Sequence, residues 1–330
     1  MDRGLPDDYT VRVALALAVR APSVHNSQPW QWRIGDRSLH LYADPGLRLR
    51  ETDPDGHDLL LSCGATLHHL RIAFAALGWR AEVHRLPIPD DPDHLASVEL
   101  HRHDPTPEEI ALAAAIPRRR TDRRRYSSWP VPGNRIAALT ERAAAEGTVL
   151  KAVTGPQPRY HLTQAITEAA SAHATNPAYQ VELAAWSGRH GSPDGVPAAN
   201  APAADPHGAV AMRQFADPRL RQPTGSLDET DESVLLVLGT ASDDRLSRLR
   251  AGEATSAVLL TATDLGLASC PLTEPLDLRD TRHQVRDQVL DGGSCPQMVF
   301  RIGWAAVNAD PLPATPRRPL DDVVSHLATQ

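Results

Sequence analysis

Apolar residues recur at helical spacing in several long stretches of the chain, and short alternating or continuous apolar runs lie between them. The helical spacing predicts helices at residues 11–19, 56–77, 108–116, 135–145 and 246–265. The short runs predict strands at residues 30–34, 38–43, 81–86, 97–101, 149–153, 234–239 and 297–304. Helices and strands are therefore mixed along the whole chain, and a Pro-rich tail follows them.

Two of the predicted helices resemble each other. Residues 64–79 (GATLHHLRIAFAALGW) align without gaps on residues 252–267 (GEATSAVLLTATDLGL), and both stretches reach a Leu-Gly pair after small residues at helical spacing. Small residues at this spacing would permit close helix packing in the centre of an α+β layer. Any two Ala/Leu-rich helices that end in Leu-Gly match in part, so a duplicated half and chance similarity are both open at this point.

The segment from residue 177 to residue 230 has no clear periodicity. It contains the run HGSPDGVPAANAPAADPHG and only scattered large apolar residues, such as Trp186, Met212 and Phe215. A stretch of this length inside a compact domain is typically a functional lid or a disordered segment. The large apolar side chains favour a docked lid, and disorder is the alternative.

Composition and charge argue against a nucleic-acid-binding or a membrane-spanning protein. The 330-residue chain is 41% hydrophobic with a formal net charge of −7, which argues against a general nucleic-acid binder. No uninterrupted apolar run approaches the roughly 18 residues that span a bilayer, and residues 1–10 carry no basic-then-apolar signal. The three cysteines, Cys63, Cys270 and Cys295, lack metal-ligand spacing and favour a reducing compartment. We expect a soluble cytoplasmic protein that binds neither nucleic acid nor a membrane.

Several familiar catalytic motifs are missing from the sequence. The 15 histidines form no HExxH or similar cluster, so we expect no metal site. The sequence contains no GxSxG and no P-loop, and no GxGxxG follows a predicted strand. The classical dinucleotide-binding Rossmann fold is therefore disfavoured.

The most informative segment is APSVHNSQPW, residues 21–30, which follows the first predicted helix. Pro22 and Pro29 hold the backbone out of helix, because each fixes φ and restricts the residue before it. The rigid loop between them carries groups that can hydrogen-bond a planar polar ligand: the side chains of Ser23, His25, Asn26 and Gln28. The alternative reading is a helix stop and a polar turn before a strand.

The densest charge cluster is RRRTDRRRY, residues 118–126, with six arginines in eight positions. Such arginines repel one another unless an anion or several carboxylates neutralise them, and arginine binds phosphate in a planar, bidentate manner. The acidic total charge and the lack of aromatic interleaving argue against RNA. We interpret the segment as a site for one phosphate group, to which Thr121 adds a hydroxyl. Arg317 and Arg318, in TPRRPLDDVV near the C-terminus, form a second basic arm.

The segment ASCPLTEPL, residues 268–276, follows the last long predicted helix. Pro271 and Pro275 are expected to keep it irregular. The backbone N–H groups of Leu272, Thr273 and Glu274 would then be free to face a ligand.

These four segments, in this order, resemble segments of the flavin-dependent nitroreductase family. APSVHNSQPW is similar to its PSxxNxQPW motif, RRRTDRRRYSSWPVP to its RxSxRxF…PVP motif, and the other two to its flavin-loop and terminal arginine segments. Ordinary members carry the arginine motif before PSxxN, whereas PSxxN comes first here. This order resembles the fused, actinobacterial Acg-like branch, in which one chain makes a nitroreductase pseudo-dimer.

The resemblance implies an α+β nitroreductase-like fold of two tandem half-repeats, with mixed or antiparallel sheets flanked by helices. The halves would be residues 1–115, with the PSxxN loop, and residues 116–330, with the phosphate arginines and a lid at about 177–230. Each half lacks the other's motif, so the resemblance implies one FMN per chain and an empty second site. The protein would be a monomer with an internal pseudo-two-fold axis or a weak homodimer.

The resemblance also implies roles for individual residues. The FMN phosphate would be bound by Arg119, Arg120, Thr121, Arg123, Arg317 and Arg318. Pro22, Ser23 and Val24 would line the isoalloxazine ring, while Asn26 and Gln28 would hydrogen-bond the ring or brace the loop. The backbone N–H of Thr273 or Glu274 would approach flavin N5. No protein acid or base is demanded, because the flavin carries the redox chemistry.

Two functions are consistent with this resemblance. The first is an FMN-dependent oxidoreductase that passes a hydride from NAD(P)H to a small electron-poor substrate such as a nitroaromatic or a quinone. The alternative is an FMN-sequestering protein with a closed lid and little turnover.

Overall fold

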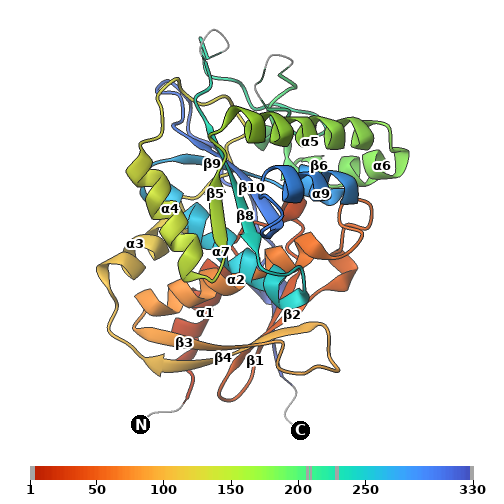
Figure 1. Ribbon diagram of the computed structural model, residues 1–330. Helices are drawn as coiled ribbons and strands as arrows, with labels where there is room; N and C mark the ends of the chain where they lie inside the picture. Colours follow the sequence, from red (N-terminus) through yellow and green to blue (C-terminus); the bar gives the residue numbers. More distant parts are fainter. Residues whose placement is uncertain (1–3, 206–207, 209, 227–229, 328–330) are drawn as a thin grey trace.

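The computed structural model describes residues 4–205, 208, 210–226 and 230–327 (Figure 1). The first half of the chain forms α1 (Asp8–Ala18), the 3₁₀ turn η1 (Val24–Asn26), β1 (Trp30–Ile34), β2 (Leu39–Ala43), η2 (Pro45–Leu47), α2 (His57–Ala76), β3 (Trp79–Arg85), β4 (His94–Arg102) and α3 (Pro107–Ala115). The next stretch forms α4 (Gly133–Ala145), β5 (Val149–Ala152), α5 (Pro156–Ala174), α6 (Pro177–Ala185), β6 (Ser187–Arg189), β7 (Val196–Pro197) and η3 (Ala198–Asn200). The last part forms β8 (Val234–Thr240), α7 (Arg245–Asp264), β9 (Ala268–Leu272), α8 (Glu274–Asp277), α9 (Arg279–Gln288), β10 (Cys295–Gly303), α10 (Leu320–Val323) and β11 (Val324–His326).

All helices and strands expected from the hydrophobic pattern are present, within three residues at each end. Their ends have local causes. Asp7 caps α1 by accepting from the Thr10 N–H, and Thr106 forms a capping box with Glu109 at the start of α3. Asp244 caps α7 in the same way as Asp7 caps α1. The pattern of helices and strands therefore agrees with the local capping chemistry.

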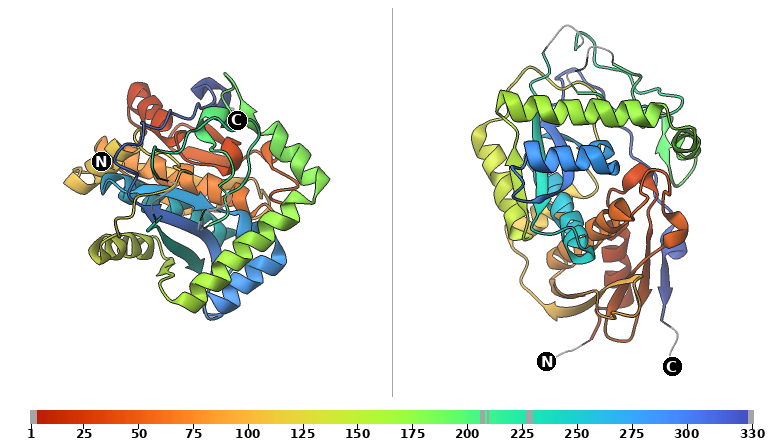
Figure 2. Two further views of the ribbon diagram at one scale, coloured as in Figure 1. Left: turned by 90° about the horizontal axis from the view of Figure 1, so that it is seen from above. Right: turned by 45° about the vertical axis from the view of Figure 1, so that its right-hand side comes forward.

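Two main sheets lie on opposite sides of the helices α2 and α7 (Figure 1). The first has the order β11-β1-β2-β4-β3, and the second has the order β5-β8-β10-β9 with all pairs antiparallel. In the first sheet only the β1–β11 pair is parallel, with Trp32 opposite Val324. Figure 2 shows the C-terminal strand, in dark blue, beside the red strands of the first sheet. The end of the chain thus completes the sheet that the beginning of the chain builds.

The helices α2 and α7 cross at the two glycines that the sequence alignment pairs. A Cβ placed on Gly64 would lie 2.0 Å from the carbonyl oxygen of Leu249, and one on Gly252 would lie 2.1 Å from that of Leu61. Only glycine permits the two backbones to approach this closely. The expected close packing of small residues is confirmed, and each half of the fold contributes one of the two central helices.

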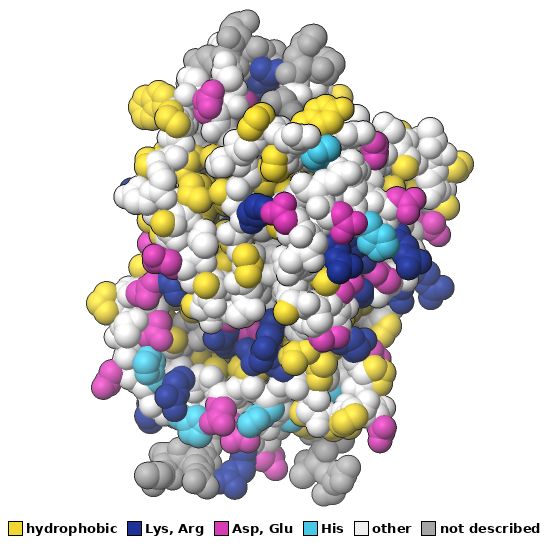
Figure 3. Space-filling view, in the orientation of Figure 1, with side chains coloured by type: hydrophobic (Ala, Val, Ile, Leu, Met, Phe, Trp, Pro, Cys, Tyr) yellow, Lys and Arg dark blue, Asp and Glu magenta, His cyan; other side chains and the backbone are white. Residues whose placement is uncertain are grey.

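The helix α2 is also the most apolar long helix. By length and composition it could cross a bilayer, but 83% of its most apolar window is buried inside the protein. It lies in a core that includes Trp30, Trp32 and Phe74, all fully buried. On the face drawn in Figure 3, acidic and basic side chains lie interspersed, as is usual for a solvent-exposed surface.

Several segments differ from the expectation. The lid segment begins with a regular helix, α6, because Asn176 caps it and Pro177 occupies its first turn. Residues 268–272 form the strand β9 rather than an irregular loop. This strand lies at the edge of its sheet, where Pro271 is tolerated because its missing N–H faces no neighbouring strand. The helices α5 and α9 were not expected. Residues 206–207, 209 and 227–229 of the lid segment lie outside the described residues.

Candidate functional site

One cavity lies where the PSxxN loop, the helix α2 and the loop after β9 meet, and the lid segment covers it. Its empty volume is about 830 Å³, part of it open to solvent, which is within the range of small-ligand and cofactor sites. Its lining residues from the expected site are Pro22, Ser23, Val24, Thr121, Arg123, Thr273 and Glu274. It is further lined by His25, Asp58, Leu61, Ser62, Ala65, Met212, Arg213, Phe215, Thr255, Cys270, Pro271, Leu272 and Met298. The structure therefore brings residues from both halves of the chain to one cavity.

The PSxxN loop has an unusual backbone. His25, Asn26 and Gln28 have φ values of 48°, 55° and 53°, in the left-handed region that non-glycine residues rarely adopt. The hydroxyl of Ser23 accepts a hydrogen bond from the Gln28 N–H at 2.9 Å, and the Ser62 hydroxyl accepts from the Val24 N–H at 3.3 Å. The loop is thus held from within and from α2, as is common where function stores backbone strain.

The two amides of this loop face other backbone segments. The side-chain amide of Asn26 donates to the carbonyls of Gly195 and Pro316 at 3.1 and 3.2 Å. The amide of Gln28 donates to the carbonyl of Pro193 at 2.9 Å and accepts from the Arg318 N–H at 2.9 Å. Neither residue lines the cavity. Their contacts brace the loop against the lid segment and the C-terminal tail.

The arginines of residues 118–125 divide into two groups. Arg118, Arg124 and Arg125 are paired with the carboxylates of Asp264, Asp122 and Asp205. The remaining three, Arg119, Arg120 and Arg123, have no ion pair with any residue that the structure describes. Carboxylates therefore neutralise only half of the charge cluster.

Arg119 and Arg120, which directly precede the cavity-lining Thr121, gather with two arginines from elsewhere, Arg20 and Arg317. Arg318 follows Arg317 in the chain, and its buried Nη1 has no hydrogen-bond partner among the described residues. Arg119 is only 6% exposed, and neither its Nε nor its Nη1 has a hydrogen-bond partner among the described residues. Burial, together with the charges of Arg120, Arg20 and Arg123, lowers the pKa of Arg119 to about 10. Burial, together with the charges of Arg119, Arg20 and Arg120, lowers the pKa of Arg317 to about 9. Because these guanidinium groups repel one another and have no carboxylate partner among the described residues, a bound anion would stabilise them.

The backbone supports the same arrangement at the end of α1. The guanidinium of Arg317 donates to the carbonyls of Val19, Arg20 and Ala21, at 3.0 to 3.1 Å. These carbonyls follow the end of α1, where a cation is favoured. Arg20 itself was missed by the sequence analysis, although it stands directly before the PSxxN loop.

The lid segment inserts charged and aromatic side chains over the cavity. Arg213 is 10% exposed and donates to Asp277 at 2.5 Å, to His25 Nε2 at 3.1 Å and to the hydroxyl of Thr273 at 3.4 Å. Phe215 packs edge-on against His25 with ring centroids 5.8 Å apart. The guanidinium of Arg123 lies 4.8 Å from the Phe215 ring, and its Nη1 donates to the carbonyl of Asn200. Within its described residues, the segment is docked over the cavity.

The two aligned helices differ at one position beside the cavity. Ala65, which lines the cavity, aligns with Glu253 in the repeat. Glu253 is fully buried, and Arg71 and Arg85 both donate to it at 2.6 Å. Glu146 also pairs with Arg71. The aligned position in the second half is thus occupied by an ion-pair cluster around a buried carboxylate.

No group of three or more potential metal ligands occurs among the residues that the structure describes. Cys63 and Cys270 are buried free thiols, and burial raises the pKa of both. The raised pKa values favour the protonated thiol form of both cysteines.

Comparison with known proteins identifies close relatives over nearly the whole chain. The chain is 52% identical, over 324 residues, to the Mycobacterium tuberculosis H37Rv protein named "Putative NAD(P)H nitroreductase Rv3131", covering 98% of this chain and 93% of that protein. It is 38% identical over 318 residues to "Putative NAD(P)H nitroreductase acg" of the same strain, and the match covers 95% of this chain and 94% of that protein. The FMN-dependent nitroreductase NfnB from Mycobacterium smegmatis, solved with NADPH, matches at 16% identity with a TM-score of 0.41, over 64% of this chain and 96% of that one. No family model matches the chain.

Proposed function

Because the chain belongs to the nitroreductase family, in its Acg-like branch, we propose that it binds FMN and transfers electrons from NAD(P)H to a nitroaromatic or a quinone. The observation that carries this proposal is the cluster of Arg20, Arg119, Arg120 and Arg317 near a cavity whose lining is mostly apolar. None of these four guanidinium groups forms an ion pair with a carboxylate of the described residues. A phosphate would bind the arginine cluster, and a flat ring system attached to it would fit the cavity.

The chain's own residues would hold the cofactor at three places. Arg20, Arg119, Arg120, Arg317 and Arg318 would bind the phosphate. Buried N–H groups of Arg20, Arg119, Arg120 and Arg318 have no partner among the described residues and would supply charge-assisted hydrogen bonds. The Pro22–Val24 loop and the start of α8 would enclose the ring, where the N–H groups of Thr273 and Glu274 stand at a helix start. Bound FMN would supply the redox chemistry between NAD(P)H and an electron-poor acceptor. Phe215 and Met212 would exclude water from that chemistry.

We infer one FMN per chain, because Glu253 and its arginines occupy the position that aligns with the cavity-lining Ala65. The halves proposed at residues 1–115 and 116–330 then correspond to the two subunits of an ordinary dimer. A monomer with an internal pseudo-two-fold axis needs no second chain to complete the cavity. A cytoplasmic location fits the NAD(P)H that the reaction consumes.

A second candidate function is FMN sequestration, and one observation favours it. Arg213 ties the lid to Asp277, Thr273 and His25 at once, so the covered cavity is held by several contacts. Stopped-flow mixing of the FMN-loaded protein with NADPH separates the two functions. Bleaching of flavin absorbance supports the oxidoreductase, whereas a flavin that stays oxidised supports sequestration.

The cofactor assignment is tested by titrating the apoprotein with FMN. We expect a yellow protein with an FMN:chain ratio of one, and a loss of binding of at least ~100-fold when Arg120 and Arg318 are both changed to Ala. The matched control is Arg118→Ala, which removes an arginine already paired with Asp264. A colourless protein that takes up no FMN, or a double variant that binds as the wild type does, contradicts the proposal.

A further inference from the structure

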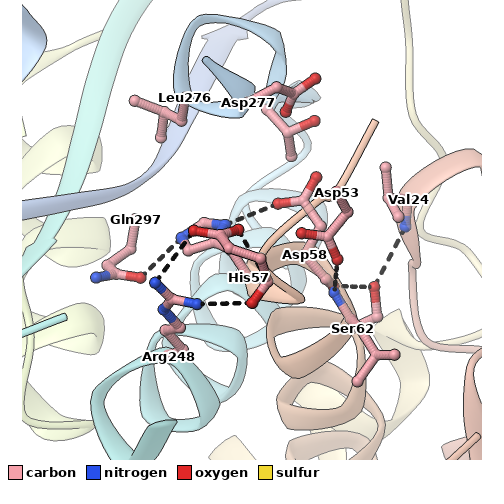
Figure 4. A network of polar contacts seen from close by, with 12 residues as sticks. Val24, Asp53, His57, Asp58, Ser62, Arg248, Leu276, Asp277 and Gln297 are labelled. Carbon is pink, nitrogen blue, oxygen red and sulfur yellow. Dashed lines mark hydrogen bonds and ion pairs between the residues drawn. The ribbon is translucent and has the colours of Figure 1, made fainter. Parts of the chain in front are cut away.

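A group of buried carboxyls lies at one side of the cavity. Asp58 of α2 and Glu274 of α8 line the cavity, whereas Asp53 of the loop before α2 and Asp277 of α8 lie behind them; each is at most 8% exposed. Figure 4 shows Asp277 reaching from α8 toward Asp53 and Asp58. Burial, together with the neighbouring Asp58 charge, raises the pKa of Asp53 to about 6. Burial also raises the pKa of Asp277, although the charge of Arg213 acts in the opposite direction.

Asp58 is the aspartate of this group that lines the cavity. Its Oδ1 lies 2.9 Å from His57 Nδ1, whereas its buried Oδ2 has no hydrogen-bond partner among the described residues. The side chain is 4% exposed, so bulk water does not solvate this oxygen. A buried, unpartnered carboxyl oxygen at a cavity wall is costly unless a ligand or a proton satisfies it.

The partners of His57 fix the orientation of its ring. Gln297 donates its amide N–H to Asp243 at 3.0 Å, so its carbonyl oxygen faces His57 Nε2 at 2.9 Å. A carbonyl only accepts, and therefore His57 Nε2 carries a hydrogen. Although burial acts in the opposite direction, hydrogen bonds from Arg248 and Gln297 hold the pKa of Asp243 below its ordinary value, so this anchor stays ionised. The other ring nitrogen, Nδ1, then faces Asp58 and positions its carboxyl.

We propose that Asp58, positioned by His57, takes up one proton when the bound flavin is reduced and returns it to the acceptor. This inference rests on the proposed FMN function. Hydride transfer from NAD(P)H brings two electrons and one proton, and the second proton comes from solvent to Oδ2 of Asp58. When a quinone is reduced, one of its oxygens receives the hydride equivalent and the other receives the Asp58 proton. The product is the hydroquinone, and Asp58 returns to the carboxylate.

The charges around Asp58 make this uptake favourable. Asp53 of the preceding loop and Asp277 of α8 both interact with Asp58, and Glu274 of α8 interacts with Asp277. The cation nearby is Arg213 of the lid segment, since Arg248 of α7 is bound to Asp243 and Asp55.

Two more imidazoles border this group. His25 of the PSxxN loop is held neutral, because burial and then Arg213 and Arg123 lower its pKa. His173 of α5 is bonded to Glu274. Reduction adds negative charge to a wall that already has more carboxyls than cations, and a like charge favours the protonated carboxyl.

The test is the pH dependence of the midpoint potential of the bound FMN. A tenfold change in proton concentration moves a two-electron potential by ~30 mV per proton, so uptake of two protons gives ~59 mV per pH unit and uptake of one gives ~30 mV. We expect the steeper slope in the wild type and the shallower slope in Asp58→Asn. The control is Asp55→Asn, a carboxylate paired with Arg248 and Arg282 away from the cavity, which should keep the steeper slope.

Two outcomes overturn the proposal: a wild-type slope of ~30 mV per pH unit, or an unchanged slope in Asp58→Asn. If Asp58→Asn does not fold, infrared difference spectra of the wild type decide, since reduction must produce a new carboxylic-acid carbonyl band. The absence of that band refutes the uptake. A wild-type protein that binds no FMN contradicts the proposed function itself, which separates the two failures.

Discussion

Replacing Arg119 with Met should stabilise the apoprotein and weaken FMN binding at the same time. The guanidinium is buried, unpaired and surrounded by other arginines, and the lowering of its pKa to about 10 corresponds to a destabilisation on the order of 3 kcal/mol at ~1.4 kcal/mol per pH unit. A buried cation whose pKa is depressed lowers the free energy of unfolding at every pH below that pKa, so Arg119 destabilises the folded apoprotein at pH 7. Methionine fills a similar volume without charge. We therefore expect a gain of about 1–3 kcal/mol, and several degrees in Tm.

The same substitution removes one charge-assisted hydrogen bond to phosphate, which is typically ~1.5–3 kcal/mol and thus roughly a 10- to 100-fold weaker Kd for FMN. Thermal melting of the apoprotein with and without FMN, and with inorganic phosphate, measures both effects. Phosphate should stabilise the wild type more than Arg119→Met. Arg118→Met, at an exposed and paired position, should change neither property. An Arg119→Met apoprotein that melts below the wild type and binds FMN equally well would refute the reasoning.

Further substitutions test the helix crossing, the lid and the acidic wall. Gly252→Ala should lower the free energy of unfolding, measured in urea, by about 3 kcal/mol or more, because the new Cβ would lie 2.1 Å from the Leu61 carbonyl oxygen. The control is Gly133→Ala, whose Cβ would meet open space and which should change the free energy of unfolding by less than ~0.5 kcal/mol. Arg213→Ala should release the lid and speed the access of NADPH to the flavin, seen as faster bleaching after stopped-flow mixing. Asp53→Asn should stabilise the apoprotein above pH 6 and leave it unchanged below about pH 4, since the raised pKa of Asp53 makes its folded-state ionisation costly only as pH rises.

The sequence predicted those features that depend on local pattern or on a linear motif. The family, the α+β fold and the tandem half-repeat are confirmed by the relatives and by the crossing of α2 and α7 at Gly64 and Gly252. The strand β9 was predicted wrongly as irregular, because the tolerance for Pro271 depends on its place at the sheet edge. The pairing of β11 with β1 also escaped prediction, since three residues near the end of the chain carry no signal for a partner so distant in sequence.

The site residues likewise divide into those that belong to linear motifs and those that only their contacts in the structure distinguish. The PSxxN and arginine motifs are linear, so the sequence located their segments and the structure brings Pro22, Ser23, Thr121 and Arg123 to one cavity. Asp58 carries no linear signature. Its neighbour His57 was one of several scattered histidines, and only the partners of its two nitrogens distinguish it.

The two aligned helices differ at a position that bears on the proposed single FMN site. The first half has Ala65, which lines the cavity, and the second half has the fully buried Glu253, which binds Arg71 and Arg85. Breaking a buried pair by removing one partner typically costs ~3–5 kcal/mol, because the remaining charges lose their neutralisation. The charge of Glu253 is therefore satisfied by the chain itself. The arginines near the cavity have the opposite property, since they repel one another in the absence of an anion. If the proposed FMN phosphate is that anion, its binding should stabilise the whole chain.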